Sequence, residues 1–147
     1  MKLYQKIIFS PGLNRSLSIR VIVGVIVMLL FAAIHLFRFG TIYSGKVHIL
    51  YYSYASNLLL PFGAYFLLSI NEIKLRFLGK WYVKALIVFA FMTFSEILQI
   101  FGIYFFGVTF DLLDILMFAI GALFAVVFDK FIFDKFIPHW AYPKESK

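Results

Sequence analysis

The sequence predicts an all-α, polytopic membrane protein with four transmembrane helices and both termini in the cytoplasm. Of its 147 residues, 63% are hydrophobic and 14% are charged, whereas soluble domains have roughly 45–50% and about 25%. The mean hydropathy is +0.95, and the apolar residues form long runs that a soluble fold of this size has no means of burying. A soluble globular fold is therefore excluded. The basic residues are also unevenly distributed between these runs, which bears on the orientation of the spans.

Four apolar runs predict the four spans. The first, residues 21–37, gives roughly 26 Å of helix and so just crosses a bilayer. The second, residues 50–70, carries no charge, and the third, residues 81–106, contains Lys84, Glu96 and Gln99. The fourth covers Leu112–Phe128. Each run is long enough for a transmembrane helix, and no linker between them is long enough to separate domains.

The basic residues predict the orientation of the four spans. Of 14 Lys and Arg residues, all but Arg38 and Lys46 fall on one side when the chain is threaded back and forth. The positive-inside rule places that side in the cytoplasm. We therefore expect an interfacial or cytoplasmic segment 1–20, a transmembrane domain 21–128 and a cytoplasmic tail 129–147.

Net charge and cysteine content exclude several classes of function. The charge of +7 comes from residues that flank the spans, which favours contact with anionic lipid headgroups over nucleic-acid binding. The absence of Cys excludes disulfides, thiolate metal sites and thiol nucleophiles. Membrane lipids are therefore the expected partners, and we predict no nucleic-acid partner.

Five polar residues mark a candidate site in the outer half of the membrane. Glu96 and Gln99 are three residues apart, as are Asp111 and Asp114, so each pair shares one helix face. Asn57 lies at a similar depth in the second span. Because polar groups facing lipid are costly, we expect these residues to converge inside the bundle. The inner half shows little beyond Lys84, which is expected to extend toward the membrane surface.

Two further features accompany these residues. Pro61 has no N–H and displaces the carbonyl of Asn57, which predicts a helix kink beside the site. The uncharged segment 101–110 contains Gly102, Tyr104 and Gly107. It is either a tight interfacial hairpin or a lid over the acidic residues.

Structural interpretations of the same residues remain open. Glu96 is either a functional acid or a buried acid that holds helices together. Asp111 is also a candidate N-cap of the fourth span, and Asp114 suits its first turn. His35, the one polar residue of the first span, is expected to form interfacial hydrogen bonds, so that span is expected to pack peripherally. No ligand spacing indicates a metal, and we predict neither a metal nor another cofactor.

A longer motif resembles that of a known family. It combines E-x-x-Q late in one span with T-F-D-x-x-D at the start of the next, and a preceding S-N-L-L-L-P-F-G at residues 56–63. This pattern resembles the VanZ-like family of small bacterial membrane proteins over about half the chain, residues 57–121. The residues that carry it are Asn57, Glu96, Gln99, Gly107, Thr109, Phe110, Asp111, Asp114 and Gly121. Val108 and Phe118 stand where the family commonly has Arg and Asn.

The resemblance implies a multi-pass protein of the bacterial inner membrane with a role in the cell envelope. The family's named member is linked to reduced susceptibility to the glycopeptide antibiotic teicoplanin. Three functions remain open at this stage. The first is a nonenzymatic protein whose outward acidic pocket binds an amphiphilic or lipid-linked envelope molecule or a glycopeptide. The others are an intramembrane acid-catalysed hydrolase or transferase and a small assembly or transport subunit, which would require a homo-oligomer.

Overall fold

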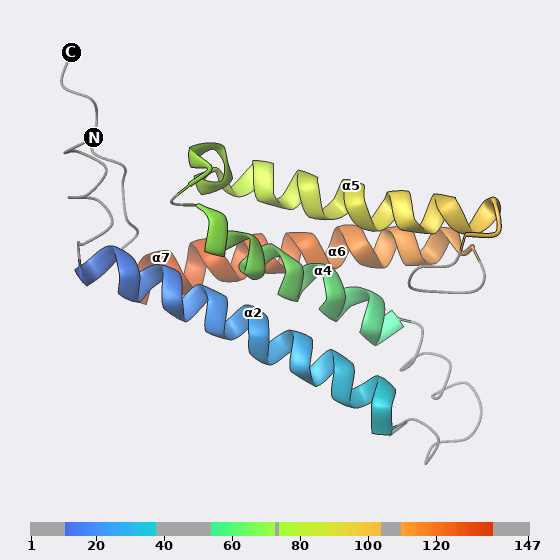
Figure 1. Cartoon of the computed structure of the whole chain (residues 1–147), viewed down its shortest axis with the longest axis horizontal. Coiled ribbons are helices and arrows are strands. Elements are labelled where there is room, and N and C mark those ends of the chain that lie inside the picture. Colours follow the sequence, from blue (N-terminus) through green and yellow to red (C-terminus); the bar gives the residue numbers. More distant parts are fainter. Residues whose placement is uncertain (1–10, 38–53, 73, 104–109, 137–147) are drawn as a thin grey trace.

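The computed structural model describes residues 11–37, 54–72, 74–103 and 110–136, and their regular structure is entirely helical. The elements in chain order are α2 (Pro11–Phe37), α4 (Ser56–Leu67), the 3₁₀ helices η3 (Leu68–Asn71) and η4 (Arg76–Gly79), α5 (Trp81–Ile100), α6 (Leu112–Phe128), the π-helical turn η5 (Asp129–Phe133) and α7 (Asp134–Phe136). The four long helices run roughly along one axis (Figure 1). The predicted all-α fold is confirmed.

Three of these helices are long and apolar enough to cross a membrane. They are Leu17–Leu36, Trp81–Ile100 and Leu112–Phe136. The remaining helix, α4, has 12 residues and continues into the four residues of η3. At ~1.5 Å per α-helical residue and ~2.0 Å per 3₁₀ residue, the two together extend about 26 Å, close to the thickness of the hydrocarbon core.

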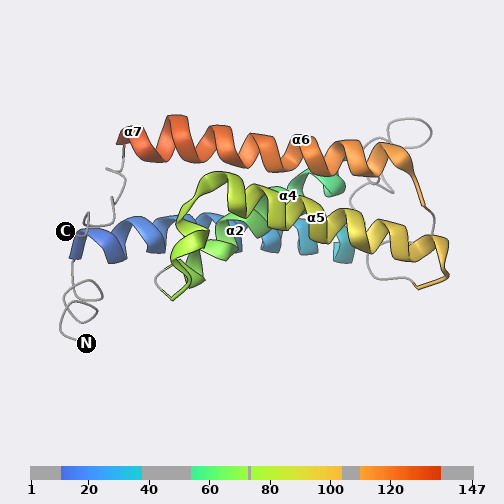
Figure 2. The same ribbon diagram turned by 90° about the horizontal axis from the view of Figure 1, so that it is seen from above.

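Helix α4 lies at the centre of the bundle and contacts α2, α5 and α6 (Figures 1 and 2). Glycines allow the close approach on two sides. A Cβ atom on Gly24 of α2 would lie 3.1 Å from the carbonyl oxygen of Gly63 in α4, and one on Gly121 of α6 would lie 2.3 Å from that of Leu58. Small residues at such crossings are typical of helix packing in membranes. The core around α4 contains Leu60, Tyr65, Phe66, Val88, Met92, Phe118, Ala125 and Phe133.

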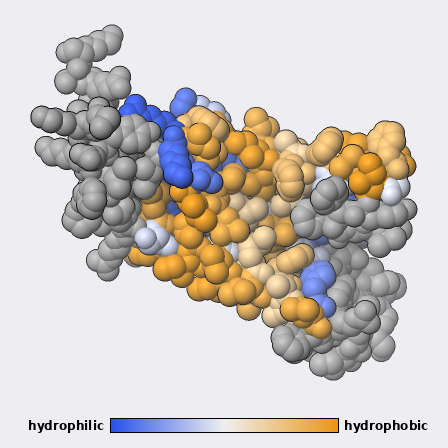
Figure 3. Space-filling model, in the orientation of Figure 1, coloured by the Kyte–Doolittle hydropathy of each residue, from blue (hydrophilic) through white to orange (hydrophobic). Residues whose placement is uncertain are grey.

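The outer surface of the bundle is apolar. Large aliphatic side chains on three helices point outward, with exposed fractions of 64% for Leu29, 65% for Leu86 and 61% for Leu123. Figure 3 shows hydrophobic residues over most of the described surface in that view. Such a surface is unusual for a soluble monomer and suits contact with lipid.

Two helices extend beyond the predicted spans, and one ends earlier. Helix α2 begins at Pro11, a residue favoured in the first helical turn, and so crosses the expected boundary at residue 20. The last helical run continues through η5 to Phe136, past the expected boundary at residue 128. Helix α5 ends at Ile100, before residue 106. Helix α2 is the least buried candidate span, but it packs along α4 as extensively as α6 does and buries Arg20 in the bundle, so the expectation of a peripheral first span is not confirmed.

Candidate functional site

The end of α5 positions Glu96 and Gln99. The helix closes with a Schellman motif, in which the N–H of Gly102 donates to the Gln99 carbonyl at 3.0 Å and the N–H of Ile103 donates to the Leu98 carbonyl at 3.1 Å. Gly102 makes this turn possible because its φ of +74° is unfavourable for other residues. Glu96 and Gln99 therefore lie in the last turns of α5, on its buried face.

The start of α6 positions Asp111 and Asp114. Asp111 is the N-cap, and its Oδ1 accepts from the N–H of Leu113 at 2.9 Å, so the predicted N-cap is confirmed. Asp114 occupies the third position of α6, the place of the acidic partner in a capping box. In a capping box that residue would accept from the N–H of the N-cap, here Asp111.

Glu96 replaces Asp114 in that role. The N–H of Asp111 donates to Glu96 Oε1 at 3.0 Å, and Gln99 Nε2 donates to Glu96 Oε2 at 2.8 Å. Both oxygens of the Glu96 carboxylate, which is 3% exposed, thus have donors from within the protein. Glu96 joins α5 to the beginning of α6, and Asp114 retains an unused oxygen.

Helix α4 completes the cluster. The Asn57 side chain lies within hydrogen-bonding reach of the Asp114 carboxylate. Pro61 lies inside α4 and faces Gly121 of α6, where an added Cβ would lie 2.7 Å from Pro61 Cγ; the kink expected at Pro61 stays a prediction. The structure therefore brings together the predicted residues, which we call the acidic site: Asn57, Glu96, Gln99, Asp111 and Asp114.

The acidic site has an excess of hydrogen-bond acceptors. Within the described residues, three buried side-chain atoms have no hydrogen-bond partner: Thr93 Oγ1, Gln99 Oε1 and Asp114 Oδ1. Thr93 and Gln99 flank Glu96 on α5 at a spacing of three residues, and Asp114 lies on the facing helix. Buried polar atoms are nearly always partnered in folded proteins. Unpartnered polar atoms therefore gather around Glu96 in the described part of the chain.

The described residues also bear on the metal, lid and histidine expectations. They contain no group of three or more His, Asp or Glu side chains arranged to hold a metal ion. Of the candidate lid residues, Gly102 caps α5, while Tyr104 and Gly107 lie outside the described residues. His35 Nδ1 lies 3.0 Å from the Phe31 carbonyl of its own helix, in keeping with a structural histidine.

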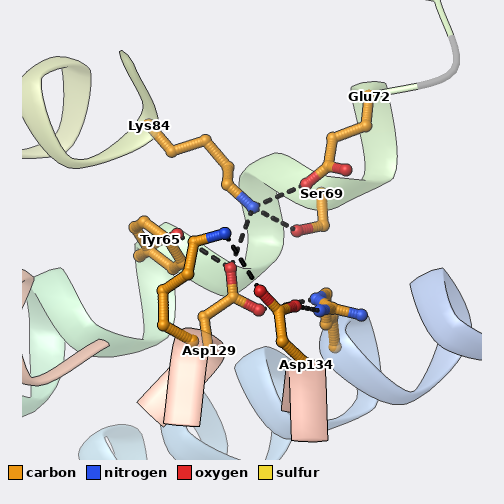
Figure 4. A network of polar contacts seen from close by, with 8 residues as sticks. Tyr65, Ser69, Glu72, Lys84, Asp129 and Asp134 are labelled. Carbon is orange, nitrogen blue, oxygen red and sulfur yellow. Dashed lines mark hydrogen bonds and ion pairs between the residues drawn. The ribbon is translucent and has the colours of Figure 1, made fainter. Parts of the chain in front are cut away.

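A second polar cluster, which sequence reasoning missed, lies at the opposite end of the bundle. Lys84 is 2% exposed, so the expectation that it extends to the membrane surface is wrong. Its Nζ donates to Glu72 Oε1 at 2.6 Å and to Ser69 Oγ at 3.3 Å, and it lies 3.7 Å from Asp129 Oδ2 (Figure 4). It also lies 4.5 Å from the centre of the Tyr65 ring.

Asp129 is the centre of this cluster. Arg20 Nε donates to its Oδ1 at 2.7 Å, and the Tyr65 hydroxyl donates to its Oδ2 at 2.9 Å. Arg20 also donates to Asp134 Oδ1 at 3.0 Å, and Asp134 pairs with Lys130. We call this set the ionic network: Arg20, Tyr65, Ser69, Glu72, Lys84, Asp129, Lys130 and Asp134. It connects α2, α4 with its 3₁₀ extension, α5 and the end of α6.

The π-helical turn explains how two aspartates reach one arginine. In an α-helix, residues five apart point about 140° away from each other. A π turn is wider, because its hydrogen bonds join residues five apart, and it brings such residues toward the same side. Asp129 and Asp134 flank the turn Asp129–Phe133, and both therefore contact Arg20.

The ionic network lacks the features of a catalytic centre. A serine–lysine pair is a known nucleophile arrangement, but Ser69 has no exposed surface, and the Lys84 ammonium is bonded to the carboxylate of Glu72. The polar side chains of this cluster pair with one another, which is the pattern of a structural network.

No family model, curated protein or solved structure matches the chain.

Proposed function

We propose that this chain is a nonenzymatic, four-span protein of the bacterial inner membrane whose acidic site binds the polar headgroup of an amphiphilic or lipid-linked envelope molecule. One observation carries the proposal. Side chains from three helices converge at one end of the bundle, and Gln99 Oε1 and Asp114 Oδ1 remain buried there without donors. A buried polar group without a hydrogen-bond partner costs about 1–3 kcal/mol. A bound headgroup would supply the missing hydrogen bonds and remove this cost.

The basic residues support an outward orientation of the acidic site. Lys74, Arg76 and Lys80 follow α4, at the same end of the bundle as the ionic network. The positive-inside rule assigns that end to the cytoplasm. The acidic site, about 18 Å along α5 from Lys84 to Glu96, then faces the cell envelope.

Binding is favoured over catalysis by the state of the Glu96 carboxylate. A general acid or base needs an oxygen that faces the substrate, and both oxygens of Glu96 accept from Asp111 and Gln99. The resemblance to the VanZ-like family supports a role at the cell envelope. We therefore propose that the protein reduces susceptibility to glycopeptides such as teicoplanin by binding an envelope molecule.

The first experiment identifies the bound molecule. The full chain and its Asp114→Asn and Glu145→Gln variants are purified in a mild detergent, and the copurifying amphiphiles are identified by mass spectrometry. We expect one class of amphiphile to be enriched with the wild type and with Glu145→Gln, which removes the same charge elsewhere, and to be depleted with Asp114→Asn. Equal lipid profiles for all three proteins would contradict headgroup binding at this site.

The second experiment tests the orientation. Alkaline phosphatase, which is active only outside the cytoplasm, is fused after successive predicted loops. We expect activity from fusions after Lys46 and Phe106 and none from fusions after Lys74 and Lys147. The opposite pattern would place the acidic site in the cytoplasm and contradict an envelope ligand.

A further inference from the structure

We infer that the acidic site recognises a primary ammonium group on its amphiphilic ligand, with Asp114 as the residue that pairs with it. The inference rests on the proposed headgroup binding and specifies the chemical class of the headgroup. It also separates the roles of the two central acids, since Glu96 positions the site and Asp114 contacts the ligand.

The first argument is the type of hydrogen bond that is missing. Three described donors of the site are already engaged: the N–H of Asp111 and Gln99 Nε2 both donate to Glu96, and the Asn57 side chain lies within hydrogen-bonding reach of the Asp114 carboxylate. The unused atoms Asp114 Oδ1 and Gln99 Oε1 are acceptors only, and the unpartnered hydroxyl of Thr93 also accepts. A complementary ligand is therefore rich in N–H or O–H donors.

The second argument is charge. Glu96, Asp111 and Asp114 form no ion pair with a Lys or Arg in the described part of the chain, where the ion pairs belong to the ionic network. Buried carboxylates are normally paired with a cation. A sugar hydroxyl would supply donors without charge, and a quaternary ammonium would supply charge without donors. A primary ammonium supplies both.

The third argument is access. Glu96 and Gln99 are 3% and 6% exposed, whereas Asp111 and Asp114 are only partly buried. A headgroup entering from the Asp114 side meets this partly exposed side chain first. The two unused acceptors, Asp114 Oδ1 and Gln99 Oε1 on the facing helix, are both buried, so the headgroup must displace neighbouring side chains to reach them. Because Glu96 already holds Asp111 and Gln99, its role is to keep these two helix ends together.

The test compares two detergent-like probes with the same charge and chain. Dodecylammonium and dodecyltrimethylammonium are titrated into the full chain in dodecyl maltoside micelles, and binding is followed by intrinsic fluorescence. We expect at least about tenfold tighter binding of dodecylammonium, equivalent to about 1.4 kcal/mol. The Asp114→Asn variant should reduce this ratio to near one, and the charge-matched control Glu145→Gln should retain it.

A methylation series makes the test independent of variant folding. The affinity of the wild type for dodecylammonium, its N-methyl and its N,N-dimethyl derivatives should fall as N–H donors are removed. Equal binding of all members would overturn the inference while leaving headgroup binding intact. Failure of every amphiphile to bind would overturn the proposed function as well.

Two further arms identify the source of the ammonium and its competitor. Nanodiscs of phosphatidylethanolamine and phosphatidylcholine with identical acyl chains test a phospholipid source, and dodecyl glucosaminide with its N-acetyl derivative tests an amino-sugar source. Preference for the free amine in either pair supports the inference.

Arg38, which lies outside the described residues, is the alternative internal cation. An ammonium preference that appears only in Arg38→Ala would overturn the inference.

Discussion

Neutralising Asp129 should be among the most damaging single changes in this chain. Its carboxylate is 2% exposed and lies 2.7 Å from Arg20 Nε, 2.9 Å from the Tyr65 hydroxyl and 3.7 Å from Lys84 Nζ. Asp129→Asn preserves the size of the side chain and removes its charge. Arg20 and Lys84 then each lose one carboxylate partner. Losing one partner of a buried ion pair costs about 3–5 kcal/mol.

Two milder changes provide the scale for this loss. Tyr65→Phe removes one hydrogen bond to a charged group, and we expect a cost of about 1.5–3 kcal/mol. Lys130→Gln breaks an ion pair whose lysine side chain is 37% exposed, so its cost should stay below about 1 kcal/mol. The predicted order of destabilisation is Asp129→Asn, then Tyr65→Phe, then Lys130→Gln.

The free energy of unfolding is measured by titrating sodium dodecyl sulfate into dodecyl maltoside micelles, with circular dichroism as the readout. A double-mutant cycle with Arg20→Gln and Asp129→Asn should give a coupling above about 1 kcal/mol, because residues in direct contact are not additive. A loss below about 1 kcal/mol for Asp129→Asn, or strict additivity in the cycle, would refute a buried ionic network at this end of the bundle.

Two other predictions concern the crossing of α4 with α6 and the acidic site. Gly121→Ala should destabilise the protein by about 1–3 kcal/mol in the same titration, because its Cβ would lie 2.3 Å from the Leu58 carbonyl oxygen; an unchanged midpoint would contradict the close α4–α6 contact. Glu96→Gln should cost about 1–3 kcal/mol, because an amide has one acceptor for the two donors from Asp111 and Gln99. A neutral result would show that Glu96 does not join α5 to α6.

The acidic site was predictable because its information is local in the sequence. Two polar pairs at a spacing of three residues, Glu96 with Gln99 and Asp111 with Asp114, each define one helix face. The short connection between their helices then restricts which faces can meet. Asn57 required only the assumption that polar groups avoid lipid. What the sequence did not reveal is that Glu96 accepts from the Asp111 N–H and leaves Asp114 with a free oxygen.

The ionic network was missed because its partners are far apart in the sequence. Arg20 and Asp129 are separated by 109 residues, and their contact depends on how α2 and α6 pack around α4. The positive-inside rule counts Arg20 and Lys84 as charges that flank membrane spans, and it gives no weight to nearby acids. The available signal was that Glu72, Asp129 and Asp134 fall on the same predicted side as these cations.

The contrast between the two polar clusters bears on how the acidic site keeps its unused acceptors. If the helices could rotate freely, conformations in which the free oxygens of Asp114 and Gln99 accept hydrogen bonds would be favoured, because an unpartnered buried group is costly. The ionic network opposes such rotation at the other end, where Tyr65 and Ser69 of the α4–η3 segment bond to α6 and α5. Because α4 also carries Asn57, fixing one end of this segment restrains the other. Under the proposed function, this restraint would hold the acidic site in the geometry that binds the headgroup and so lower the ordering cost of binding.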